Sequence, residues 1–84
     1  MEGIKTTQYF EFTRQRSDRA EIKDEWILQA VNHPVEEAIQ SDGRIRRWAW
    51  VEGAEKYLRV ILLEDGKTIH NAFYDRRFKP KGTP

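Results

Sequence analysis

The second half of the chain contains the segment QSDGRIRRWAWVEGAEKYLRVILLEDGKTIHNAFYDR, residues 40–76. Apolar and polar residues alternate within it in three runs: residues 45–51, 57–63 and 67–74. This period of two is typical of half-buried strands. Asp42-Gly43 precedes the first run and Asp65-Gly66 separates the last two, and Asp-Gly favours a two-residue type I′ turn. The segment therefore predicts an antiparallel β-meander.

The turns also predict which side chains share a face of the sheet. With a two-residue loop at Asp65-Gly66, Leu62 pairs with Ile69 and Leu58 with Phe73. The apolar face of the last two strands then holds Leu58, Val60, Leu62, Ile69, Asn71 and Phe73, and the opposite face holds Tyr57, Arg59, Ile61, His70, Ala72 and Tyr74. In the first run, Ile45, Ala49 and Val51 suit the apolar face, and Arg46, Trp48 and Trp50 suit the other. Arg47 falls on the apolar side, so we expect it at an edge or extended outward to solvent.

Upstream of the meander the sequence predicts one strand and one helix. Tyr9–Thr13 is rich in aromatic residues and predicts a strand. Helical spacing of apolar residues follows, with a start either at the capping-box pattern of Asp18 to Glu21 or at Lys23-Asp24. The helix should end near Asn32-His33-Pro34, because Pro disfavours helical geometry in the residue before it. Residues 35–40 fit either a strand or a helical turn.

These elements predict a single α+β domain. An N-terminal strand and helix pack on a C-terminal antiparallel meander of three to four strands. We expect an ordered core at residues 7–78 and flexible ends at residues 1–6 and 79–84, because the tail KPKGTP is polar. A chain of 84 residues can build one modest core.

Composition narrows the classes of function. The chain has no cysteine and two histidines, which excludes a zinc-finger-type site, and we expect neither metal nor cofactor. It has no apolar run of the roughly 20 residues that a membrane span needs. These features favour a cytoplasmic, bacterial-type protein without membrane contact. The net charge of +1 neither favours nor excludes a nucleic-acid partner, because only local clustering would.

One set of residues on the polar face could carry catalysis: His70, Arg59, Arg46 and Tyr74. Imidazole is the side chain best suited to proton transfer near neutral pH, and guanidinium groups hold phosphate. His70 would move protons, the two arginines would stabilise charge developing on a phosphate, and Tyr74 would orient or stack. A metal-independent ribonuclease needs such a set.

A second set could bind RNA or a protein partner: Trp48, Trp50, Tyr57, Arg76 and Arg77. Aromatic rings stack on unpaired bases. The same rings, interspersed with arginine, are also typical of protein interaction surfaces. The alternative to an RNA-binding role is therefore a non-catalytic module that forms a homodimer or binds a partner through this face.

Four segments resemble a family of small, mainly bacterial domains known as domain of unknown function 4258: residues 25–27, 40–46, 56–60 and 68–76. The most specific part is KYLRVILLEDG followed by TIHNAFYDR, and the resemblance covers about residues 9–79. Many members carry His–Ala–x–x–x–Arg before the helix. Here that region is Phe12-Thr13-Arg14-Gln15-Arg16, so the chain has no counterpart of that histidine.

The family looks like a distant relative of the RelE-like and barnase-like ribonucleases, in which toxins of toxin–antitoxin pairs cut RNA. The resemblance implies an N-terminal helical part followed by a four-stranded antiparallel sheet. It also implies RNA or the ribosome as a partner, and an antitoxin protein as another. The leading hypothesis is therefore a RelE-like domain that binds RNA and cleaves it through His70.

Overall fold

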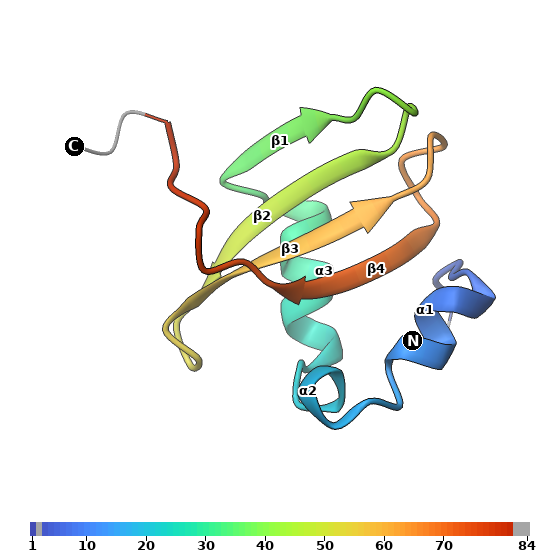
Figure 1. Cartoon of the computed structure of the whole chain (residues 1–84), viewed down its shortest axis with the longest axis horizontal. Helices are drawn as coiled ribbons and strands as arrows, with labels where there is room; N and C mark the ends of the chain where they lie inside the picture. The colour runs from blue at the N-terminus through green and yellow to red at the C-terminus, as the bar shows by residue number, and fades with distance from the viewer. Residues whose placement is uncertain (2, 82–84) are drawn as a thin grey trace.

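The computed structural model describes residues 1 and 3–81 and has the predicted α+β fold (Figure 1). Its elements in chain order are α1 (Gln8–Thr13), α2 (Ser17–Ala20), α3 (Asp24–Asn32), β1 (Glu36–Ile39), β2 (Ile45–Val51), β3 (Lys56–Leu62) and β4 (Ile69–Tyr74). The strands form one antiparallel sheet in the order β1-β2-β3-β4, which confirms the meander. The segment at residues 35–40 is resolved in favour of a strand. Of the ends predicted to be flexible, residues 2 and 82–84 lie outside the described residues.

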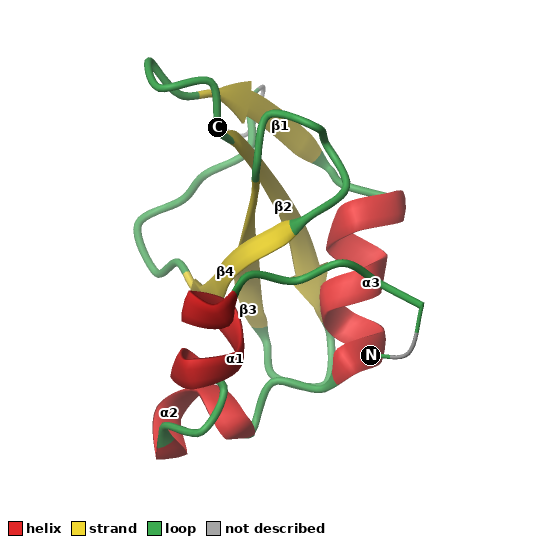
Figure 2. Cartoon of the chain, turned by 90° about the vertical axis from the view of Figure 1, so that its right-hand side faces the viewer, coloured by secondary structure: helices red, strands yellow, loops and turns green. Residues whose placement is uncertain are grey.

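The longest helix, α3, covers one face of the sheet, as the view in Figure 2 shows. It begins at Asp24, the second of the two predicted starts, with Asp24 and Glu25 in its first turn, where carboxylates favour the helix dipole. It ends at Asn32, before His33 and Pro34, as predicted. None of the helices in the described part of the chain has the length and apolar character required to span a bilayer.

The predicted strand at Tyr9–Thr13 is wrong, because this segment forms α1. Thr7 caps the helix by accepting a hydrogen bond from the backbone N–H of Phe10 at 3.1 Å. Phe10 and Thr13 are buried, and their spacing of three places both on one side of a helix. The cap and this spacing outweigh the preference of aromatic residues for strands.

The prediction of type I′ turns at Asp42-Gly43 and Asp65-Gly66 is also wrong. A type I′ turn needs positive φ at both central residues, but in these two loops only the glycines have it, with φ of 89° at Gly43 and 68° at Gly66. Gln40 N–H donates to the Arg44 carbonyl at 2.8 Å, which leaves a three-residue loop. Asp42 and Asp65 accept backbone N–H groups two residues ahead, so each aspartate favours its turn without adopting positive φ.

The strand register changes at His70. Leu62 pairs with Ile69 as predicted, but Ile61 pairs with Asn71 instead of His70, and Arg59 pairs with Phe73. An extra residue in one strand is a β-bulge, and it shifts all later side chains to the opposite face. Ala72 and Tyr74 therefore lie on the face predicted for Asn71 and Phe73, and those two lie opposite.

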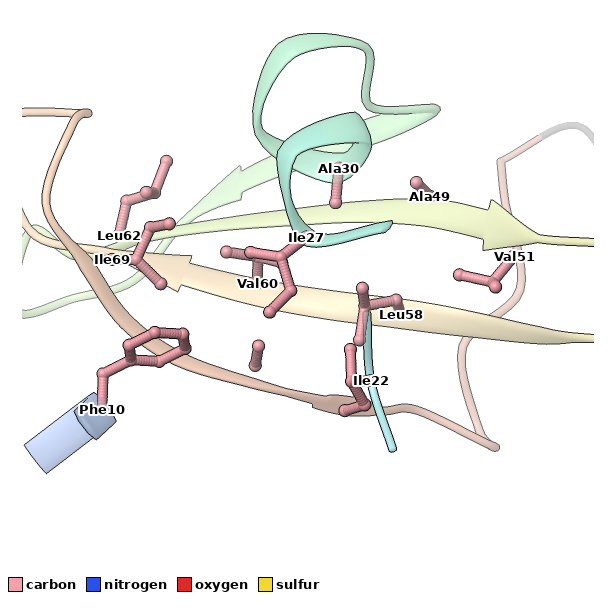
Figure 3. Close-up of a cluster of buried hydrophobic side chains, with 11 residues drawn as sticks. Phe10, Ile22, Ile27, Ala30, Ala49, Val51, Leu58, Val60, Leu62 and Ile69 are labelled. Atoms are coloured by element: carbon pink, nitrogen blue, oxygen red, sulfur yellow. The ribbon is translucent and has the colours of Figure 1, made fainter. Parts of the chain in front are cut away.

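The core lies between α3 and the sheet, with Phe10 closing one end (Figure 3). Its buried side chains are Phe10, Ile22, Ile27, Ala30, Ala49, Val51, Leu58, Val60, Leu62, Ile69 and Ala72. The other side of the sheet, here called the open face, carries the residues of opposite parity: Arg46, Trp48, Trp50, Tyr57, Arg59, Ile61, Asn71 and Phe73. The predicted division of β2 between the two faces agrees with this.

Arg47 has the core-face parity that made it conspicuous in the sequence. Its Nη1 donates to the carbonyl of Val31 in the last turn of α3 at 2.9 Å, and its Nε pairs with Glu37 at 2.7 Å. A cation at a helix C-terminus satisfies free carbonyls and favours the dipole. Arg47 thus fastens α3 to the sheet.

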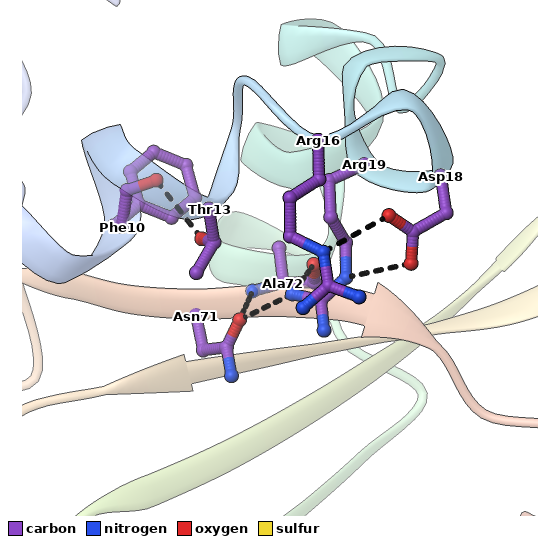
Figure 4. A network of polar contacts seen from close by, with 7 residues as sticks. All are labelled: Phe10, Thr13, Arg16, Asp18, Arg19, Asn71 and Ala72. Carbon is purple, nitrogen blue, oxygen red and sulfur yellow. Dashed lines mark hydrogen bonds and ion pairs between the residues drawn. The ribbon is translucent and has the colours of Figure 1, made fainter.

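A second arginine, Arg19, fastens α2 to the edge of β4 (Figure 4). Its Nη1 donates to Asn71 Oδ1 at 2.7 Å and to the Ala72 carbonyl at 3.3 Å, and its Nε lies 3.6 Å from Asp18. Its guanidinium carbon also lies 5.2 Å from the centroid of the Phe73 ring. No pattern in the sequence predicted a role for Arg19.

Candidate functional site

Arg59 and Arg46 lie on the open face, in neighbouring strands, as predicted. Each of these two arginines donates hydrogen bonds to a different residue. Arg59 donates from Nε and Nη2 to Asp75 Oδ2, at 3.0 and 2.5 Å, and its guanidinium lies between the rings of Trp48 and Phe73. Arg46 donates from Nε to Gln40 at 2.9 Å. Arg59 is therefore committed to an internal ion pair.

Asp75 is the centre of this arrangement. Its side chain is 9% exposed, and the same oxygen that accepts from Arg59 accepts from Trp48 Nε1 at 3.0 Å. Burial opposes ionisation, but the hydrogen bonds from Trp48 and Arg59 outweigh it and hold the pKa of Asp75 below its ordinary value. One signal for Asp75 is visible in the sequence, an acidic residue directly after an aromatic strand, but its role depends on the fold.

His70 is the extra residue of the β-bulge and lies beside α1. Its Nδ1 is 3.1 Å from Thr7 Oγ1, and its ring stacks on Tyr9 at 5.0 Å. Burial, reinforced by the charge of Arg44 and opposed by that of Asp42, lowers its pKa below the ordinary value. The imidazole is therefore mainly neutral at pH 7 and contributes to holding α1 in place.

Tyr74 lies on the opposite side of the sheet from Arg59. It pairs with Leu58 and packs against the core, while Lys56 Nζ lies 5.1 Å from its ring centroid. Burial, and then the charge of Glu21, raise its pKa. Within the described residues, no hydrogen bond or ion pair links any two of the four residues predicted to be catalytic. The structure does not assemble them around one reacting atom.

The residues predicted for binding lie closer together than those predicted for catalysis, because three of them line one pocket. Trp50, Tyr57 and Arg76 line one pocket of about 290 Å³, together with Glu55, Lys56, Asp75 and Phe78. We call this the aromatic pocket. The Tyr57 ring lies edge-on to Trp50 and to Phe78, with both centroid distances at 5.0 Å. Trp50 is 42% exposed, so one large aromatic surface remains accessible to a ligand.

Trp48, in contrast, is 5% exposed. Phe78 stacks on it nearly parallel, with centroids 4.5 Å apart and planes inclined by 10°. The chain after β4 therefore folds back over the open face, and the backbone N–H of Lys81 reaches Glu36 at 2.9 Å. Trp48 supports this C-terminal segment, residues 75–81, instead of facing solvent. Arg77 is exposed on it, and its N–H donates to Asp75.

Cations gather on the C-terminal segment. Four of its seven residues are basic, Arg76, Arg77, Lys79 and Lys81, and all four are exposed. Within the part of the chain that the structure describes, neither these four nor Arg46 and Lys56 form an ion pair with a carboxylate. Neither Lys56 nor Phe78 was among the residues predicted for binding. Phe78 had a signal, as the one aromatic residue in an otherwise polar tail.

No group of three His, Asp or Glu side chains among residues 1 and 3–81 is placed to hold a metal ion. Comparison with known proteins adds no relative. No family model matches the chain, no curated protein matches it, and no solved structure matches it. The resemblance to the domain of unknown function 4258 stays a prediction.

Proposed function

We propose that the protein binds single-stranded RNA through the aromatic pocket and the basic C-terminal segment. The observation that carries the proposal is the pocket itself: three rings, Trp50, Tyr57 and Phe78, with Lys56 and Arg76 beside them. Proteins that bind unpaired strands combine stacking rings with cations that follow the backbone. A base stacked on Trp50 would place its phosphate near Arg76. A cytoplasmic location and a bacterial RNA partner belong to this proposal.

The structure supports RNA binding better than RNA cleavage by the residues predicted to be catalytic. General acid–base catalysis requires groups within hydrogen-bond reach of the same reacting atoms. Arg59 is held by Asp75, and Tyr74 lies on the other side of the sheet. We therefore propose a binding domain without the predicted catalytic set. A RelE-like toxin activity would have to rest on other residues.

The test is a binding titration with a labelled single-stranded RNA of about eight nucleotides, a length within the usual site sizes. Trp50→Ala should weaken binding by about 5- to 150-fold, the value of one base–aromatic stack. Phe12→Ala is the matched control, because Phe12 is an aromatic residue 71% exposed on α1, outside the pocket. Arg76→Gln should reduce the salt dependence, by about 0.7 in the slope of log K against log salt.

Absence of binding by the wild-type protein, or equal losses in Trp50→Ala and Phe12→Ala, would refute the proposal. The alternative of homodimerisation through the aromatic face has less surface available, because Phe78 covers Trp48. It remains testable by sedimentation. A dimer that Trp50→Ala converts into a folded monomer would favour the alternative.

A further inference from the structure

The loop between β2 and β3 contains an unusual backbone conformation at the rim of the aromatic pocket. Glu55 has a φ of 53°, and it is the one residue other than glycine with positive φ in the described part of the chain. This left-handed region is ordinarily occupied by Gly or Asn. The loop contains a glycine, Gly53, but at a position where φ is not positive. The fold therefore holds a strained glutamate where glycine would be unstrained.

The strain places an acceptor at the pocket. Glu55 lines the aromatic pocket beside Trp50 and Lys56, and its side chain is exposed. Within the described residues its carboxylate forms no hydrogen bond or ion pair. Glu55 is joined to Glu52 of the same loop through the backbone, where the Glu55 N–H donates to the Glu52 carbonyl. Residues kept in strained conformations cluster at ligand sites. The second carboxylate of the pocket, Asp75, is already occupied by Arg59 and Trp48.

A free carboxylate next to a stacking ring selects among bases. An ionised carboxylate only accepts hydrogen bonds, and it has two oxygens side by side. Bases in unpaired strands are recognised through their Watson–Crick edges. Guanine presents two adjacent N–H donors on that edge, whereas adenine, cytosine and uracil each place an acceptor beside their donor. A carboxylate therefore pairs with guanine twice and with the other bases once at most.

We infer that Glu55 is a specificity-determining residue and that the aromatic pocket takes guanine. The inference rests on the proposed RNA-binding function and adds the identity of the base. The guanine ring stacks on Trp50, its Watson–Crick edge donates two hydrogen bonds to the Glu55 carboxylate, and Lys56 and Arg76 neutralise the adjoining phosphates.

The experiment measures the affinities of four labelled RNAs of about eight nucleotides that are uridine throughout except for G, A, C or U at one central position. The wild-type protein should bind the guanine RNA about tenfold more tightly than the other three, in the range for one bidentate contact to a base. Glu55→Gly should abolish this preference, so that the guanine RNA is bound no more tightly than the other three. Glu52→Gly, in the same loop but outside the pocket, should retain the preference.

Glu55→Gly is suited to this purpose because glycine accepts the backbone conformation without strain, so its melting temperature should not fall. Glu55→Asn, which also tolerates positive φ and keeps one acceptor oxygen, should retain a reduced preference. Binding without base preference, or a preference that survives in Glu55→Gly, overturns the inference but leaves RNA binding intact. Absence of binding to all four RNAs overturns both.

Discussion

The Asp75 side chain lies at the centre of the hydrogen-bond network on the open face. One carboxylate joins the first residue after β4 to Trp48 on β2 and Arg59 on β3, and so connects three strands on the side that α3 does not cover. A half-buried arginine without its partner, and an indole N–H without an acceptor, are both costly. The stability of the open face should therefore depend on this residue.

Asp75→Ala should lower the free energy of unfolding by about 2–4 kcal/mol, measured by urea denaturation. Asp18→Ala is the control, since its ion pairs lie at an exposed side chain and should be worth less than about 0.5 kcal/mol. An equal effect for the two variants would show that the Asp75 network adds nothing to stability.

The same residue predicts acid sensitivity. The folded state lowers the pKa of Asp75, so its contribution is complete above the unfolded-state pKa of about 3.9 and is lost as pH falls through the lower folded-state value. In measurements from pH 6 downward, the free energy of unfolding should decrease once the pH is under about 4. Asp75→Asn should flatten that decrease. A slope identical in wild type and Asp75→Asn would contradict the assignment.

At the scale of elements, the sequence predicted the features that depend on local periodicity or on the position of Pro and Gly. The three C-terminal strands, the division of β2 between two faces and the end of α3 at Asn32 all follow from such patterns. The β-bulge at His70 does not follow from such patterns. An extra residue in this strand depends on the contacts that Thr7 and α1 make with His70. That shift also places Tyr74 on the opposite face of the sheet from Arg59, where the sequence had predicted both on one face.

Thr7 makes the contact on which α1 depends. Its Oγ1 accepts from the Phe10 N–H and lies 3.1 Å from His70 Nδ1. Thr7→Ala should therefore cost about 1–2 kcal/mol in unfolding free energy, as for other N-caps. Thr7→Ser keeps the hydroxyl and should stay within about 0.5 kcal/mol of the wild type. Equal losses for Ala and Ser would assign the effect to the lost methyl group and not to the cap.

At the scale of the whole molecule, the net charge of +1 concealed an uneven distribution. The C-terminal segment has four basic residues and one acidic residue, whereas the rest of the chain is slightly acidic. Composition could suggest this excess, but only the fold places it beside Trp50 and Tyr57. The aromatic pocket could not be predicted because it requires Phe78 to return across two strands.

Phe78→Ala tests how firmly the C-terminal segment is held. The variant should lose about 1–2 kcal/mol, because Phe78 is half-buried and stacks on Trp48. Tryptophan emission should shift to longer wavelength as Trp48 becomes exposed to water. Phe12→Ala, at an exposed site, should change neither quantity. An unchanged emission spectrum in Phe78→Ala would contradict the described cover over Trp48.

The contact between α1 and β4 bears on the order of folding. The Thr7 N–H donates to the Ile69 carbonyl at 3.0 Å, and α1 packs against β4, although some sixty residues separate them. Hairpins between consecutive strands close short loops, while this contact closes a long one, and loop closure costs more entropy as the loop lengthens. We expect the sheet and α3 to assemble first and α1 to join late. Substitutions in α1 should then speed unfolding and leave the folding rate nearly constant.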